Sequence, residues 1–241
     1  MERLLENSGT RIWSTCNGQG SALILCNGGP GCDDYLGPVS AMIEDICQVI
    51  RFEPRGCGRS SRDNRYDLET TIDDVEFVRC AYGLGKIIVS GHSAGVDVAL
   101  AYALKYPANT AGIIGISGGR IVNDREWSRV YHENLDKKGE DNGGRIFDAD
   151  PEVNKTGNAS WKKYITRPEL LSDLSKMQMP AVFINAEADI RPNWPARQLA
   201  KLISRGDYIE IPGAGHCIWL SQPDTLRAEL RAAVKKLKTA P

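Results

Sequence analysis

Short runs of apolar and β-branched residues recur along the chain. Seven of them are predicted to be strands: 11–15, 22–27, 48–53, 86–91, 111–117, 181–186 and 208–213. Several are apolar at every position, which is typical of strands covered on both faces. Helical patterns lie between them, at 34–45, 69–83, 94–106, 194–204 and 222–238. Because strands and helices alternate, the pattern predicts an α/β fold with a mostly parallel sheet and helices on both faces.

The alternation is interrupted after the fifth predicted strand. Residues 120–178 show no strong strand pattern, and this polar stretch contains Trp127, Tyr131, Trp161 and Tyr164. These aromatic residues argue against a long disordered loop. We therefore expect a short lid inserted over one end of the sheet. The expected division is a core in two parts, 1–119 and 180–241, and a lid, 120–179.

The composition fits one folded core and gives no sign of a charged macromolecular partner. The chain has 241 residues, of which 41% are apolar, enough to bury a sizeable core. Lys and Arg total 30 against 31 Asp and Glu, so the formal net charge is -1. We therefore expect neither nucleic acid nor a membrane as a partner. The oligomeric state stays open.

The cysteines and the N-terminal segment indicate a reducing compartment. The 7 cysteines are scattered and include no Cys-x-x-Cys pair, so we expect buried thiols and no metal site. The segment MERLLENSG is charged too early for a secretory signal. No apolar run approaches the ~20 residues of a membrane helix. We expect a cytoplasmic protein.

Two Gly-x-Ser-x-Gly patterns occur, one around Ser93 and one around Ser117. A nucleophile elbow needs a strand before the serine, a helix after it and small neighbours at the sharp turn. KIIVS precedes the motif of Ser93 and AGVDVALAYALKYP follows that serine, whereas GGRIVNDREW after Ser117 is a poor helix start. Ser93 would lie at a helix N-terminus, where partial positive charge favours a developing anion. We expect Ser93 to be a nucleophile; a plain turn hydroxyl is the alternative.

A serine hydroxyl is a poor nucleophile until a base takes its proton. The chain has 3 histidines. His92 adjoins Ser93, but neighbouring side chains diverge at an elbow, and His132 lies in the expected lid. His216 lies in the segment IPGAGHCIW, in a loop directly after a predicted strand. We expect His216 to be the base.

The base in turn needs an acid that holds its tautomer and stabilises the imidazolium. In VFINAEADIRP, Glu187 and Asp189 both follow a predicted strand. We prefer Asp189 because it comes later in the loop, just before a turn bounded by proline. Asp97, one helical turn beyond Ser93, is a weaker candidate because it points along the helix. The expected catalytic residues then follow the chain order of a nucleophile-elbow hydrolase: Ser93, Asp189, His216.

A hydrolase of this kind also needs two donors for the oxyanion. The backbone N–H of Ala94, directly after the serine, is one candidate. The segment CNGGPGCDD, residues 26–34, follows an earlier strand, and its glycines let the backbone approach a substrate. We expect the N–H of Gly29 to be the second donor; a tight turn without a chemical role is the alternative.

With these motifs in place, the sequence resembles the α/β-hydrolase fold family over nearly its whole length. The resemblance is closest to the branch of prolyl iminopeptidases and related esterases. It rests on NGGPG (27–31), similar to HGGPG, EPRGCGRS (53–60), similar to DQRGxGxS, and GHSAG (91–95), AEAD (186–189) and GAGH (213–216). The resemblance implies the same site residues: Ser93 as nucleophile, Asp189 as acid, His216 as base, and Gly29 and Ala94 as oxyanion donors.

The motifs also depart from that branch. Asn27 replaces the customary His, Glu53-Pro54 replaces Asp-Gln, and GHSAG stands where prolyl iminopeptidases usually have GGSWG. The insertion is shorter than their lid, whose acidic residues hold the substrate's amine. Glu126 and Glu133 are candidates for that part, although charged lid residues are usually just solvated. The resemblance therefore implies hydrolysis and leaves proline specificity open.

The sequence thus favours a serine hydrolase that cleaves an ester or amide of a small molecule through an acyl-enzyme. We expect no metal and no organic cofactor, and we expect Trp127 and Trp161 to shape an apolar pocket or to form the core of the lid. The nearer alternative is an aminopeptidase similar to prolyl iminopeptidase. An alternative of another class is a non-catalytic receptor for a small ligand on the same fold.

Overall fold

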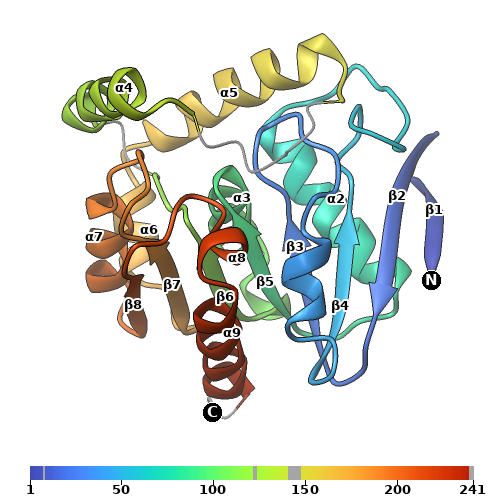
Figure 1. Cartoon of the computed structure of the whole chain (residues 1–241). Helices are drawn as coiled ribbons and strands as arrows, with labels where there is room; N and C mark the ends of the chain where they lie inside the picture. Colours follow the sequence, from blue (N-terminus) through green and yellow to red (C-terminus); the bar gives the residue numbers. More distant parts are fainter. Residues whose placement is uncertain (8, 122–123, 141–147, 239–241) are drawn as a thin grey trace.

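A mixed sheet forms the centre of the molecule (Figure 1). The computed structural model describes residues 1–7, 9–121, 124–140 and 148–238. The strand order is β1-β2-β4-β3-β5-β6-β7-β8. All neighbours from β4 to β8 pair in parallel, whereas β2 is antiparallel to β1 and β4. The strands are β1 (Glu2–Asn7), β2 (Thr10–Asn17), β3 (Ser21–Cys26), β4 (Cys47–Phe52), β5 (Ile87–His92), β6 (Thr110–Ile116), β7 (Ala181–Ala186) and β8 (Gly206–Ile211).

The predicted mostly parallel sheet is therefore confirmed, and each of the seven predicted strands overlaps an observed one. The strand missing from the prediction is β1. Its sequence ERLLEN is charged at both ends, and most of its side chains are exposed, including Leu4 at 51%. An exposed edge strand has no apolar pattern to reveal it, since its backbone pairing with β2 holds it in place.

Helices cover both faces of the sheet and its carboxyl end. They are α1 (Gly37–Ala41), α2 (Leu68–Ala81), α3 (Ala94–Lys105), α4 (Arg125–Lys138), α5 (Pro151–Ile165), α6 (Leu170–Ser175), α7 (Trp194–Leu202), α8 (Ile218–Ser221) and α9 (Pro223–Lys238). Four predicted helices match α2, α3, α7 and α9 closely. The predicted helix at 34–45 is shortened to α1, where turns follow Ala41.

Two hydrophobic cores lie on the two faces of the sheet. One core joins apolar residues of α2, α3, α6 and α7 to the sheet, with Leu100, Tyr102 and Phe183 among its buried side chains. The other joins α1, α8 and α9 to the opposite side of the same strands, with Leu226 and Leu230 among them. Strands such as β3, β5 and β7 are buried on both faces for this reason, as their uniformly apolar sequences predicted.

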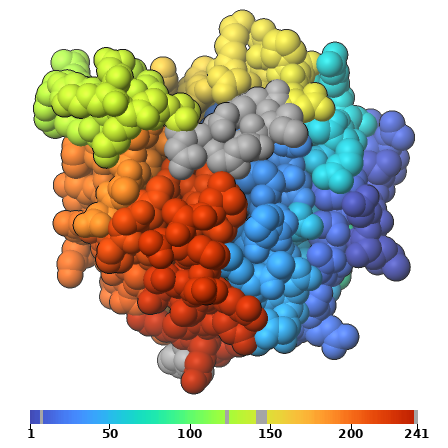
Figure 2. Space-filling view, viewed as in Figure 1, coloured from blue at the N-terminus to red at the C-terminus, as the bar shows by residue number. Residues whose placement is uncertain are grey.

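Most described residues of the segment expected to be a lid lie in α4, α5 and α6. Residues 122–123 and 141–147 of that segment lie outside the described part. In Figure 1, α4 and α5 lie over the end of the sheet at which the parallel strands finish, and Figure 2 shows both helices on the same side of the molecule. Asp124 caps α4 by accepting from the Trp127 N–H at 3.1 Å, and Asp150 caps α5 in the same way. These helices place aromatic side chains above the carboxyl ends of the strands.

The cysteines are mostly but not all buried. Five have buried side chains: Cys26, Cys32, Cys47, Cys57 and Cys217. Cys16 is partly exposed and Cys80, in the last turn of α2, is exposed, so the expectation of buried thiols is wrong at Cys80. Within the described ranges, no helix combines the length and the apolar character needed to cross a membrane.

Candidate active site

Ser93 lies at the turn between β5 and α3, as the sequence predicted. Its backbone has φ 56° and ψ -123°, in a region that residues with a side chain rarely adopt. The Ser93 N–H donates to the carbonyl of Ile116 at 2.9 Å, which fixes the turn against β6. The serine therefore stands at the end of the central strand, before the first turn of a helix.

Two glycines of the motif allow this turn because α3 crosses the strand ends at very short range. A Cβ added at Gly95 would lie 2.2 Å from the carbonyl oxygen of Cys26. A Cβ added at Gly91 would lie 2.1 Å from the backbone of Gly95 itself. Any side chain at either position would force the helix away from β3 and β5, so the spacing Gly-x-Ser-x-Gly is required by packing as well as by the turn.

The structure brings together Asp189 and His216, which lie on different loops. His216 Nδ1 lies 2.6 Å from Oδ2 of Asp189, and both side chains are almost fully buried. Since an ionised carboxylate can only accept, Nδ1 carries the hydrogen and donates it. In the neutral imidazole, Nε2 then holds the lone pair that a general base needs.

The environment of Asp189 keeps it ionised. Burial raises its pKa, but the hydrogen bond and charge of His216 and the Arg191 N–H, which donates at 3.0 Å, outweigh burial and leave the pKa below its usual value. The alternative acid, Glu187, is exposed and instead accepts from the Gly213 N–H at 2.9 Å. The later position in the loop is thus the one that meets the histidine.

His92 links two loops through the two nitrogens of its ring. Its Nε2 lies 3.1 Å from the carbonyl oxygen of His216, and its Nδ1 lies 2.7 Å from the Tyr35 hydroxyl. Because a carbonyl only accepts, Nε2 of a neutral His92 carries the hydrogen and Nδ1 accepts from Tyr35. The same Tyr35 hydroxyl accepts from the Gly28 N–H at 2.8 Å. With both nitrogens engaged, His92 joins the loop after β3 to the loop that carries His216.

The candidate residues converge on one cavity of about 230 Å³. Its wall includes all but one of the expected site residues: Gly29, Ser93, Ala94, Trp127, Trp161 and Asp189. His216 is not part of the wall, but it contacts the wall residue Asp189, and its ring centroid lies 4.6 Å from that of His92, the neighbour of Ser93. The cavity is small, which fits a ligand of modest size.

The expected oxyanion donors flank the serine. A Cβ added at Gly28 would lie 3.0 Å from Cβ of Ser93, so the glycine loop runs directly beside the serine. The Gly28 N–H is occupied by Tyr35, which leaves that of Gly29 as the candidate in this loop. Ala94 is the first residue of α3, and the first N–H groups of a helix have no partner within the helix.

Asn27 replaces the histidine of related motifs and has a structural contact. Its Nδ2 donates to the carbonyl of Phe52 at 3.2 Å, which ties the end of β3 to the end of β4. Asn27 also belongs to the cavity wall. The substitution therefore keeps a buried polar side chain at this position without adding an ionisable group to the cavity.

Ser117, the other serine between glycines, also lines the cavity. It too has positive φ, 46°, and its N–H donates to the carbonyl of Ile184 at 2.9 Å. Its side chain is only 4% exposed, and no helix begins in the described residues that directly follow it. Ser117 thus shares the backbone strain of Ser93 but not the helix N-terminus.

The remaining candidates of the expected lid have separate positions. Trp127 of α4 donates from Nε1 to the carbonyl of Pro192 at 2.9 Å, which joins α4 to the loop after β7. His132 is exposed on α4, with Nδ1 2.6 Å from the carbonyl oxygen of Ser128. Glu126 and Glu133 are exposed and both pair with Arg129. Neither glutamate lines the cavity.

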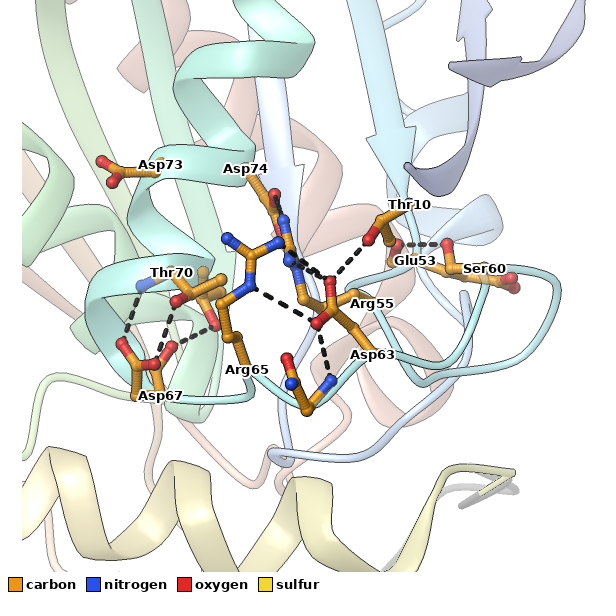
Figure 3. Close-up of polar contacts among 12 residues, drawn as sticks. Thr10, Glu53, Arg55, Ser60, Asp63, Arg65, Asp67, Thr70, Asp73 and Asp74 are labelled. Atoms are coloured by element: carbon orange, nitrogen blue, oxygen red, sulfur yellow. Dashed lines mark hydrogen bonds and ion pairs between the residues drawn. The ribbon is translucent and has the colours of Figure 1, made fainter. Parts of the chain in front are cut away.

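The segment EPRGCGRS forms a braced loop beside the cavity (Figure 3). Arg55 donates from Nε and Nη2 to both oxygens of Asp74, at 2.7 and 2.6 Å, and from Nη1 to Asp63 at 2.5 Å. Glu53 accepts from the N–H groups of Asp34 and Arg59 at 3.1 and 2.5 Å. Here the glutamate that replaces the customary aspartate holds two loops together.

Among the residues that the structure describes, no group of three or more His, Cys, Asp or Glu side chains is arranged to hold a metal ion. The polar groups in and beside the cavity suit nucleophilic chemistry: a strained serine, a buried histidine–carboxylate pair and backbone N–H groups at a helix start.

A family model described as alpha/beta hydrolase fold matches residues 21–137. A proline iminopeptidase from Saccharolobus solfataricus is 35% identical over 127 residues, which cover 50% of this chain and 41% of that protein. One from Thermoplasma volcanium is 36% identical over 101 residues, covering 40% of this chain and 34% of that protein. The matches thus span less than half the length of these curated relatives.

Solved structures resemble the whole chain. An esterase from Thermogutta terrifontis has a TM-score of 0.80 at 22% identity, covering 99% of this chain and 100% of that one. A proline iminopeptidase from Mycobacterium smegmatis has a TM-score of 0.76 at 16% identity, covering 98% of each chain. At such identities the likeness shows a shared fold.

Proposed function

We propose that this chain, which has the α/β-hydrolase fold and matches that family's model over residues 21–137, is a serine hydrolase acting on an ester or amide of a small molecule. The observation that carries the proposal is the pairing of His216 with Asp189 at 2.6 Å beside a cavity lined by Ser93. The three side chains come from loops after different strands, and a structural turn alone would not require that arrangement.

In the proposed reaction, Ser93 Oγ attacks the substrate carbonyl while His216 Nε2 takes its proton. The oxyanion accepts hydrogen bonds from the N–H groups of Gly29 and Ala94, and Asp189 stabilises the imidazolium. The imidazolium gives its proton to the leaving alcohol or amine, and an acyl-enzyme remains. Water, activated by His216, then releases the acid and restores the serine.

A panel of short p-nitrophenyl esters with two serine variants tests this proposal. We expect Ser93→Ala to lower kcat by at least about 10³-fold, because the nucleophile is lost. The matched control is Ser117→Ala, which removes the other serine between glycines on the same cavity and should keep kcat within about threefold. Loss of turnover in Ser117→Ala with full activity in Ser93→Ala would refute the assignment.

An aminopeptidase is the second candidate, because the curated relatives named above are proline iminopeptidases. Against it, Glu126 and Glu133 pair with Arg129 and do not line the cavity. Comparing proline p-nitroanilide with the ester panel separates the two reactions. A non-catalytic receptor on the same fold would hydrolyse neither compound and would not react with a fluorophosphonate.

A further inference from the structure

The cavity holds two charged side chains for which the proposed reaction has no use, Asp97 and Arg120. Asp97 lies on α3 four residues after Ser93, which is the N-cap residue of that helix, and both residues line the cavity. Arg120 follows β6 in the segment ISGGR. Both therefore stand within reach of a short molecule bound at the serine.

Arg120 contacts two aromatic rings and forms no ion pair within the described residues. Its guanidinium carbon lies 3.8 Å from the ring centroid of Trp127 and 5.3 Å from that of Trp161. Nη2 donates to Ser128 Oγ at 3.1 Å, while the buried Nε has no hydrogen-bond partner in the described part of the chain. Cation–π contacts with the two indoles hold the guanidinium in place and leave donors for another acceptor.

The other arginines of the cavity wall differ from Arg120 in this respect. Arg55 is paired with Asp74 and Asp63. Arg191 is paired with Asp189 and Glu140. Within the described ranges, no carboxylate oxygen lies within 4.0 Å of the Arg120 guanidinium. Arg120 is partly buried, so the absence of an ion pair carries a cost that a bound anion would reduce.

The nearby carboxyl groups are unable to neutralise Arg120 fully. Asp124 accepts from the Trp127 N–H and from Trp194 Nε1 at 2.8 Å. Asp97 is 5% exposed, and its Oδ1 has no hydrogen-bond partner among the described residues. Burial raises the pKa of Asp97 to about 7, although the Trp161 N–H and the Arg120 charge act in the opposite direction. At neutral pH, Asp97 is therefore protonated in a large fraction of molecules.

We propose that Arg120 binds a carboxylate carried by the substrate, so that the preferred substrates are esters or amides of small molecules with a second, free carboxylate. The guanidinium donates to that carboxylate, and protonated Asp97 adds an O–H donor. Because Ser93, Asp97 and Arg120 line one small cavity, we expect substrates of the size of a succinate or glutarate monoester. This inference rests on the proposed function and names its substrate class.

Two matched pairs of esters test the preference. One pair places the charge in the acyl part, mono-p-nitrophenyl glutarate against p-nitrophenyl valerate. The other places it in the alcohol part, 3-acetoxypropanoate against propyl acetate. We expect kcat/KM for the anionic member to exceed that for the neutral member by at least about tenfold in one pair, the usual gain from a charged hydrogen-bonded contact. Equal or lower values for the anionic members of both pairs would overturn the proposal.

Variants assign the preference to Arg120. Arg120→Met removes the charge but keeps an apolar chain beside the indoles, and should abolish the preference for the anionic member of each pair. Arg120→Lys should restore part of it. The matched control is Arg129→Met, an exposed arginine of α4 that does not line the cavity, which should retain the full preference. A preference that survives in Arg120→Met contradicts the assignment.

The pH dependence adds a second readout. Besides Arg120, the titratable group that interacts with Asp97 is Tyr164 of α5; Arg120 is also influenced by Asp124 and Tyr131. As the pH rises from 6 to 8, Asp97 ionises, offsets Arg120 and repels the substrate carboxylate, so the anionic preference should fall. In Asp97→Asn it should stay constant over this range. A preference that falls equally in both proteins would contradict this role.

Binding without turnover separates this inference from the proposed function. Glutarate should raise the Tm of the native protein and of Ser93→Ala, but not that of Arg120→Met. If no ester is hydrolysed and glutarate still raises the Tm in this pattern, the hydrolase proposal fails while the anion site stands. If neutral esters are hydrolysed but glutarate has no effect on Tm and no anionic preference exists, the anion site fails alone.

Discussion

The backbone of Ser93 is strained, and contacts with neighbouring residues hold it in this conformation beside the cavity. With φ 56°, the serine is held in place by the hydrogen bond from its N–H to Ile116 and by the close approach of Gly28 and Gly118. Strain of this kind persists only where surrounding contacts over-determine it. It presents the hydroxyl to the cavity beside the pair formed by Asp189 and His216.

The raised pKa of Asp97 predicts how the free energy of unfolding depends on pH. Because its pKa is raised to about 7 by burial, the folded protein binds this proton more tightly than the unfolded chain does. Between pH 4 and pH 7 this group therefore lowers the free energy of unfolding as the pH rises. We compare the free energy of unfolding of Asp97→Asn with that of the native protein. Because one pKa unit corresponds to about 1.4 kcal/mol, we expect the difference, variant minus native, to be a few kcal/mol larger at pH 8 than at pH 4.

Urea denaturation at both pH values measures this difference. The comparison between the two proteins cancels the other groups that titrate in the same range. If the difference in free energy of unfolding between Asp97→Asn and the native protein is the same at pH 4 and pH 8, Asp97 titrates normally in the folded state.

Single residues were predictable where a motif identifies them. The serine between glycines, the histidine after a strand and the carboxylate late in its loop each follow from a local pattern. In the structure the serine and the carboxylate line one cavity, and the histidine contacts the carboxylate. The sequence did not predict the roles of Arg120 and Tyr35, or that His92 links two loops. Their importance depends on which indole, hydroxyl or carbonyl lies opposite them, and those partners come from distant parts of the chain.

At the scale of elements, the crossing of α3 over the strand ends depends on glycine. We expect Gly95→Ala to lower the free energy of unfolding by about 1–3 kcal/mol or to abolish folding, because its Cβ would lie 2.2 Å from the Cys26 carbonyl oxygen. The matched control is Gly85→Ala, where an added Cβ meets nothing within 4 Å. Thermal denaturation followed by circular dichroism compares the two, and equal stability would contradict this packing argument.

Most elements were predictable because they combine a strong apolar pattern with burial. The strands β3, β5 and β7 are covered on both faces, and α2 and α3 begin at clear sequence signals. By contrast, β1 is an exposed edge strand, and α4 has Trp127 as its only buried residue. Elements held by backbone pairing or by a single large side chain leave little periodicity in the sequence.

At the scale of the whole molecule, the loop after β4 is anchored to α2 by the buried network around Arg55 (Figure 3). Breaking such a pair leaves an uncompensated buried charge, so we expect Arg55→Met to lower the free energy of unfolding by about 3–5 kcal/mol. Arg129→Met breaks only the exposed pairs on α4 and should cost at most about 1 kcal/mol. Chemical denaturation measures both; similar costs for the two variants would contradict the anchoring role.

The fold as a whole was predictable from the alternation of strands and helices, since a right-handed crossover places each helix on one face of a parallel sheet. The composition of the cavity was not, because its wall draws on the ends of several strands and on α4 and α5. The aligned segments cover less than half the length of the two curated relatives named above. The substrate preference therefore has to be inferred from the residues that line this cavity.

The central claim is that Ser93 is the nucleophile, and covalent labelling tests it most directly. The native protein would be treated with a fluorophosphonate, digested and mapped by mass spectrometry, with the heat-denatured protein as control. The account predicts a single phosphonylated peptide with the label on Ser93, absent from the denatured sample. A label on Ser117, or no label on folded protein that still hydrolyses esters, would contradict it.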